Sequence, residues 1–159
     1  MPDEKVYEEK LTKALADAFI AQDNAKKYMI VMPKMHGAKA AVCKRISDLL
    51  HISTTQAEEY INMRNGRFKP GKQLSYCRDE QLKQAFDYLE ITVTEYNKIP
   101  KFSNLAEANS IADVKLRTAK YAQAEIIKLF GEKKANEIFK RAVITAQKQT
   151  NVVIHNKAF

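Results

Sequence analysis

The chain has 159 residues, the size of one domain or of two small ones. Hydrophobic residues make up 45% of it, which excludes wholesale disorder, and 27 Lys and Arg against 19 Asp and Glu give a formal net charge of +8. An acidic start and an apolar run no longer than Met29–Met32 exclude a secretory signal and a membrane-spanning helix, so we expect a soluble, cytoplasmic protein.

The first predicted element is an amphipathic helix that begins after Asp3. This residue favours the N-cap position, because its carboxylate can accept a hydrogen bond from a free backbone N–H. Apolar residues then recur at helical spacing from Tyr7 to Phe19, which indicates one buried face. The helix should end near residues 22–24.

The next segment does not distinguish a strand from a helix. Residues 28–32 form an apolar run that is too short for its period to decide. Pro33 and Gly37 should interrupt the chain after it. We therefore expect residues 1–36 to form an N-terminal helical extension.

Two short helices joined by a tight turn should follow. The first spans about Ala38–Leu50, with lysines on its outer side. The second begins after Ser53, a good N-cap, and continues to Met63. Asn65-Gly66 is a helix C-terminal signal, and a basic loop that contains Arg64, Arg67, Lys69 and Lys72 should follow the helix.

A further helix should open at Asp79 and carry an apolar stripe to Leu89. Thr92 or Thr94 should cap a short turn after that stripe. Pro100 should then close the unit, because proline cannot continue a helix.

The last third predicts two more helices. One apolar stripe covers Ile111–Phe130 and ends at Gly131, and a second covers Ala135–Ala146. These stripes suit either the completion of the core or pairing with a second copy of the chain. The lysines and arginines of both helices fit contact with phosphates and a solvated face equally well. Residues 150–159 predict a short strand or a docking segment.

The expected fold class is all-α in three parts: the extension of residues 1–36, a central domain of residues 37–100, and a C-terminal helical pair in residues 101–159. Positive charge is concentrated in part of the chain, because residues 37–78 hold eight basic and three acidic side chains. Such a cluster favours a polyanionic partner, since each neutralised phosphate releases counterions. A solvated surface is the alternative.

Motifs of catalysis or metal binding were not found in the sequence. Thirty-three residues separate Cys43 from Cys77, and without a secretory signal both favour buried free thiols. The three histidines are too scattered for a metal site, and the four glycines fit no phosphate-binding loop. We therefore expect no enzymatic activity, no metal and no cofactor.

The segment around the tight turn has the spacing of a helix-turn-helix. Ser47 is small where the two helices would cross. Five side chains are spaced so that all can meet in the angle between the helices: Ile46, Leu50, Ile52, Ala57 and Tyr60. With the basic loop and the helix after it, residues 40–99 resemble the lambda-repressor-like (Cro-type) family of regulators. The resemblance implies a supporting helix over residues 42–50 and a recognition helix over residues 53–63 that enters the major groove.

The resemblance also implies which residues contact DNA. Gln56 and Asn62 have the amide geometry to bind adenine, while Thr54 and Thr55 suit a phosphate or a thymine methyl group. The exposed side of the recognition helix would consist of Ser53, Thr54, Thr55, Gln56, Glu59 and Asn62. The anchors on the phosphate backbone would be Lys44, Arg45, Arg64, Arg67 and Lys69.

Double-stranded DNA is therefore the expected partner. The expected function is a sequence-specific transcriptional regulator, a repressor of the phage, plasmid or bacterial type, that acts as a homodimer. The alternative is a non-enzymatic interaction or inhibitor protein that binds a protein partner through the same helical scaffold, with Glu58 and Glu59 in the contact face. RNA binding and a small enzyme are less favoured, because the sequence motifs typical of them were not found.

Overall fold

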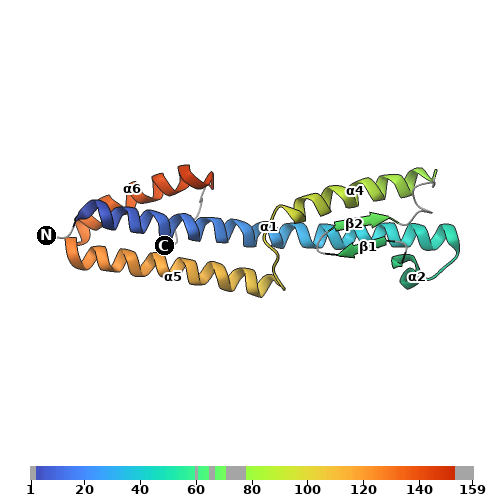
Figure 1. Ribbon diagram of the computed structural model, residues 1–159, viewed down its shortest axis with the longest axis horizontal. Coiled ribbons are helices and arrows are strands. Elements are labelled where there is room, and N and C mark those ends of the chain that lie inside the picture. Colours follow the sequence, from blue (N-terminus) through green and yellow to red (C-terminus); the bar gives the residue numbers. More distant parts are fainter. Residues whose placement is uncertain (1–2, 60, 65–66, 71–77, 153–159) are drawn as a thin grey trace. The chain divides into compact units, whose positions relative to one another are not determined.

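The computed structural model describes residues 3–59, 61–64, 67–70 and 78–152. These residues are predominantly helical, which confirms the expected all-α class, and one antiparallel β-hairpin is added to the helices (Figure 1). In chain order the elements are α1 (Glu4–Leu50), α2 (Thr54–Glu58), β1 (Ile61–Arg64), β2 (Arg67–Pro70), α4 (Glu80–Asn97), α5 (Leu105–Phe130) and α6 (Glu132–Thr150).

Helix α1 continues through both positions at which an interruption was expected, so the predicted end near residues 22–24 and the break at Pro33 and Gly37 are wrong. Pro33 leaves the carbonyl of Met29 without its helical N–H donor. Because Met29 is 53% exposed, water can bind that carbonyl instead. Gly37 also lies on the exposed side, where it costs about 1 kcal/mol relative to alanine. Packing of the opposite side of α1 offsets these costs.

The chain forms two compact units, and α1 contributes to both. Residues 1–26 and 102–159 make up the first, which we call the three-helix unit. Residues 27–101 make up the second, which we call the hairpin unit.

In the three-helix unit, the first part of α1 packs with α5 and α6 (Figure 1). Alanines on α5 and α6 let the helix backbones approach closely. The Tyr7 and Phe130 rings pack edge to face with their centroids 5.8 Å apart. The deeply buried side chains of this core include Leu11, Leu15, Ala119, Ile126, Ile138 and Ala142.

Both predicted C-terminal helices are present, although the first begins earlier than its apolar stripe. The Asn104 side chain accepts a hydrogen bond from the Glu107 N–H at 2.9 Å and so caps α5. The first turn of α5 therefore precedes the stripe that begins at Ile111. Within the predicted tail, residues 153–159 lie outside the described residues.

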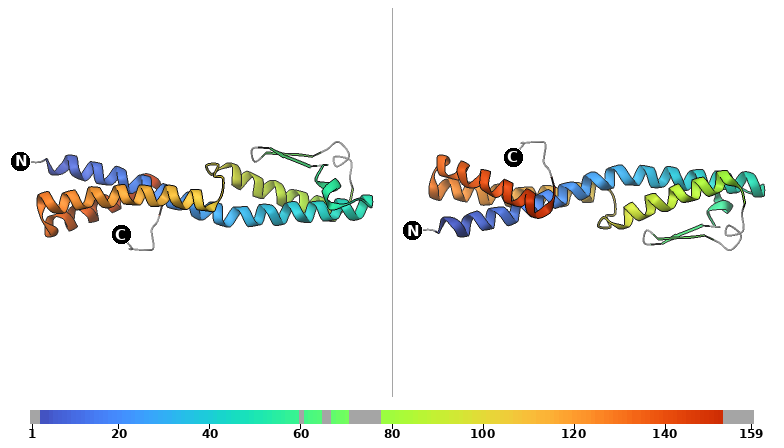
Figure 2. Two further views of the ribbon diagram at one scale, coloured as in Figure 1. Left: turned by 90° about the horizontal axis from the view of Figure 1, so that it is seen from below. Right: turned by 90° about the horizontal axis from the view of Figure 1, so that it is seen from above.

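In the hairpin unit, the second part of α1 packs with α2, the hairpin and α4. Figure 2 shows α4 and the hairpin on the same side of this part of α1. The core of the unit includes Val42, Ile46, Ala57, Ile61, Leu82 and Leu89.

Helix α4 is longer than the sequence pattern indicated. Thr92 and Thr94 do not cap a new turn, because α4 continues unbroken to Asn97. Their hydroxyls instead donate to the carbonyls of Leu89 and Glu90, each at 2.8 Å, within the same helix. The expected separate turn is therefore wrong.

Candidate nucleic-acid interface

The expected recognition helix over Ser53–Met63 is wrong. Helix α2 covers only Thr54–Glu58, and the backbone of Ile61–Arg64 forms strand β1. Pairing with β2 gives the backbone groups of β1 the hydrogen bonds that a longer helix would supply internally. Ile61 is only 5% exposed and joins the start of the strand to the core. The residues expected on its exposed side are thus divided between α2 with its two caps and strand β1.

The turn between α1 and α2 lies where the sequence predicted a tight turn. His51 has a left-handed backbone with φ of 54° directly after α1. Glycine is the usual residue in that conformation at a helix end. The Ile52 N–H donates to the Ser47 carbonyl at 3.2 Å, and the Ser47 hydroxyl donates back to the Ile52 carbonyl. These contacts fix the direction in which the chain leaves α1.

Helix α2 is stabilised by a capping box. The Ser53 hydroxyl oxygen accepts a hydrogen bond from the Gln56 N–H at 3.0 Å, and Gln56 Oε1 accepts one from the Ser53 N–H at 3.1 Å. The amide oxygen of Gln56, expected to contact adenine, is therefore used within the helix. Thr54 and Thr55 are exposed beside it.

The register of the hairpin pairs polar and basic residues of the two strands. Asn62 lies opposite Lys69, and Arg64 lies opposite Arg67. Opposite residues in an antiparallel pair share a face, and successive residues alternate between faces. These four residues therefore share one face, which we call the basic hairpin face. The other face holds Ile61, Met63, Phe68 and Pro70.

Ile61 is buried in the core of the hairpin unit, so strand β1 begins against that core. By register, Ile61 and the basic hairpin face belong to opposite faces of the hairpin. Arg64, Arg67 and Lys69, expected in a loop, are thus held by strands. Asn65-Gly66, which separates the two strands, is the dipeptide that most favours a two-residue hairpin connection, and it was the signal that could have predicted the hairpin.

The two expected anchors on α1 differ in their surroundings. Lys44 is exposed. The Arg45 guanidinium donates to both carboxylate oxygens of Asp79, from Nε at 2.9 Å and from Nη2 at 2.5 Å. Asp79 also accepts a hydrogen bond from the Leu82 N–H at 2.8 Å, which caps α4. Arg45 therefore has a structural partner that no sequence spacing could identify, 34 residues away.

The contacts of Asp79 with Arg45 and with the Leu82 backbone change the pKa of its carboxyl group. Hydrogen bonds from Arg45 and from the Leu82 backbone lower the pKa of the carboxyl to about 2. The carboxylate is therefore charged at every physiological pH. The Asp79 carboxylate joins α1 to the start of α4.

Charge in the hairpin unit is predominantly positive. Residues 27–101 contain 13 basic and eight acidic side chains, a net charge of +5. Strands β1 and β2 contain three basic residues and no acidic one. Glu58 and Glu59 are exposed directly before the hairpin, so the positive surface has an acidic border.

The structure describes one of the two cysteines. The Cys43 thiol is buried, as expected, and burial together with Glu58 raises its pKa, which disfavours the nucleophilic thiolate. Cys77 lies outside the described residues. Within the described ranges, no three His, Cys, Asp or Glu side chains are grouped closely enough to hold a metal ion.

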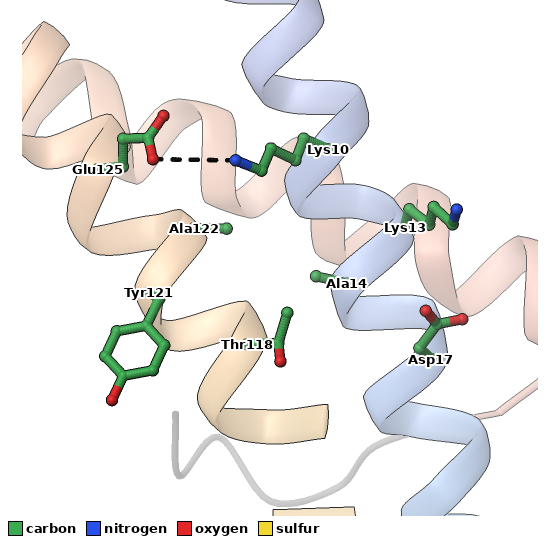
Figure 3. A pocket seen from close by; sticks show the side chains of 8 residues that line it. All are labelled: Lys10, Lys13, Ala14, Asp17, Thr118, Tyr121, Ala122 and Glu125. Atoms are coloured by element: carbon green, nitrogen blue, oxygen red, sulfur yellow. Dashed lines mark ion pairs between the residues drawn. The ribbon is translucent and has the colours of Figure 1, made fainter. Parts of the chain in front are cut away.

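A groove in the three-helix unit is a different kind of surface (Figure 3). It lies between α1 and α5, and Tyr121 stands at its edge with 74% of its surface exposed. Lys10 and Glu125 form an ion pair across it at 3.9 Å. The lining residues are Lys10, Lys13, Ala14, Asp17, Thr118, Tyr121, Ala122 and Glu125. Two lysines and two carboxylates balance in charge, so the groove does not favour a polyanion.

Comparison with protein-family models, curated proteins and solved structures found no match to the chain. Across the described ranges, no helix has both the length and the apolar character needed to cross a bilayer.

Proposed function

We propose that the protein binds double-stranded DNA through the basic hairpin face. The observation that carries this proposal is the register that pairs Asn62 with Lys69 and Arg64 with Arg67. It gathers three cations and one amide on one face of the hairpin, while Ile61, which belongs to the opposite face, is buried in the core.

A two-stranded antiparallel ribbon has the dimensions to enter the major groove of B-DNA. The two paired strands lie about 4.8 Å apart, so the ribbon is narrow enough for a groove about 12 Å wide. Burial of Ile61 fixes the start of β1 and so limits the entropy lost on binding. Of the residues expected to contact DNA, one of the recognition-helix set, Asn62, and three of the backbone anchors lie on this hairpin: Arg64, Arg67 and Lys69.

Each residue of the basic hairpin face suits a particular contact. Arg64 and Arg67 can bind a guanine edge or a phosphate through two parallel hydrogen bonds. Asn62 can bind the edge of adenine, and Lys69 can bind a phosphate as a point charge. Contacts to base edges would give sequence preference, which is the basis for proposing a transcriptional regulator. The protein-partner alternative stays a prediction.

The experiment is fluorescence anisotropy with a random duplex and with duplexes selected from a random pool. Arg64→Ala with Arg67→Ala should weaken binding to all of them by roughly 30-fold or more. The matched control, Arg117→Ala with Lys120→Ala, removes the same charge from exposed positions on α5. Equal losses in both double variants would show that only net charge matters, and would contradict the proposed interface.

A further inference from the structure

The second part of α1 has an exposed face made of regularly spaced residues. Ile30 is 44% exposed, and all the other members are exposed as well. The spacing alternates between four and three residues, so the set forms one continuous seam along the helix. We call it the outer face of α1; it consists of Ile30, Lys34, Gly37, Ala41, Lys44 and Asp48.

The outer face of α1 is turned away from the rest of the hairpin unit. Figure 2 shows α4 and the hairpin on one side of this part of the helix, and the α1 residues in the shared core, such as Val42 and Ile46, do not belong to the outer face. A Cβ added at Gly37 would meet no atom within 4 Å. With Ala41 one turn further on, the centre of this face has little side-chain bulk, so another helix backbone can approach it closely.

The charges on this face are self-complementary in one orientation. Lys34 precedes Ala41 by seven residues, and Asp48 follows it by seven. If two copies of α1 pack antiparallel with both Ala41 residues on the two-fold axis, Lys34 of each copy lies opposite Asp48 of the other. A parallel pair would instead place Lys34 against Lys34 and Lys44 against Lys44, and like charges repel.

We propose that a second copy of the chain docks on the outer face of α1, as an antiparallel helix pair centred on Ala41. Two Lys34–Asp48 ion pairs, each about 10 Å from the axis, flank Gly37, Ala41 and Lys44 of each copy. Lys44 lies about 4.5 Å from the axis, and its long side chain can extend past the small residues so that its ammonium group stays in water. The contact is isologous, so it closes as a dimer and leaves no free copy of the surface. It does not depend on DNA, nor on the C-terminal helices that the sequence suggested for dimerisation.

A charge exchange tests this register by sedimentation equilibrium over a range of protein concentrations. Lys34→Glu and Asp48→Lys should each raise the dimer dissociation constant by roughly tenfold or more, because each places like charges opposite one another twice. The two changes in one chain should restore the dimer, since the new carboxylate of each copy then faces the new ammonium group of the other. Weakening by both single variants without restoration would overturn the proposal, and so would a wild-type protein that is monomeric throughout.

A steric variant gives an independent readout. Gly37→Trp places a bulky ring on the face, one turn from Ala41 and in open space, so the monomer should keep its helical circular dichroism while the dimer is lost. Ala124→Trp, at an exposed position on α5, is the matched control and should leave the dimer intact. A dimer that tolerates Gly37→Trp, or that dissociates with Lys140→Glu on α6 instead, would place the interface elsewhere and overturn the proposal.

Discussion

Arg45 of α1 and Asp79, the N-cap of α4, are joined by two hydrogen bonds of 2.9 and 2.5 Å. The same carboxylate holds the first turn of α4 through the Leu82 N–H. One ion pair thus fixes the position of α4 against the end of α1, where the chain turns toward α2.

We expect the stability that this pair confers to depend on pH. Asp79 has a pKa of about 2 in the folded protein and about 4 when unfolded, so its contribution is complete above pH 4 and is lost as the pH falls toward 2. Asp79→Asn keeps a good N-cap but removes the charge. Its melting temperature should be a few degrees below wild type at pH 7, and the difference should shrink between about pH 4 and pH 2.

Thermal unfolding of both proteins at several pH values measures this difference. A gap between the two melting temperatures that is as large at pH 2 as at pH 7 would show that the charge of Asp79 is not what stabilises the contact.

Helix α4 offers a matched pair of truncations. Leu89 is fully buried in the core of the hairpin unit, whereas Ile91, two residues later, is 57% exposed. Leu89→Ala should reduce the free energy of unfolding by about 2–5 kcal/mol, and Ile91→Ala by no more than about 0.5 kcal/mol. Urea denaturation measures both values, and similar losses would contradict the described orientation of α4.

The turn after α1 predicts a stabilising substitution. His51 has φ of 54°, a left-handed conformation that costs a non-glycine residue roughly 1–2 kcal/mol. His51→Gly should therefore raise the free energy of unfolding by up to about 1 kcal/mol, because glycine relieves the strain but loses more chain entropy on folding. His51→Val should lower the free energy of unfolding. A more stable valine variant would show that the backbone there is not left-handed.

Gln56 tests whether the capping box exists as described. Gln56→Glu keeps an acceptor for the Ser53 N–H and places a negative charge in the first turn of α2, so stability should be unchanged or higher. Gln56→Ala should lower it by about 0.5–1 kcal/mol. A glutamate variant as unstable as the alanine variant would indicate that the side chain makes a different contact.

The helices were predictable from apolar periodicity, but their lengths were not. Pro33 and Gly37 indicate interruption when only local preference is considered. In the fold they lie on the exposed side of a helix whose other side is buried over many turns, and that packing outweighs the local cost. Thr92 likewise suggested a cap, yet it is 2% exposed and bonds within α4.

The candidate site was predictable in part, since its basic residues were identified but not the structure that presents them. The pattern around Ala57 and Ile61 fitted a continuing helix as well as a turn into a strand. Only the partner strand, Arg67–Pro70, decides between the two, because it supplies the hydrogen bonds that β1 requires. The contact between Arg45 and Asp79 depends on the tertiary fold and has no local signal.

Salt dependence of duplex binding tests the central claim most directly. The logarithm of the association constant should fall linearly with the logarithm of salt concentration, with a slope of about −0.9 for each phosphate contact. For Arg64→Ala with Arg67→Ala the slope should be shallower than wild type by up to about 1.8, while Arg117→Ala with Lys120→Ala should keep the wild-type slope. Equal slopes for the wild type and the hairpin variant, or no duplex binding between about 50 and 200 mM salt, would contradict DNA binding through the basic hairpin face.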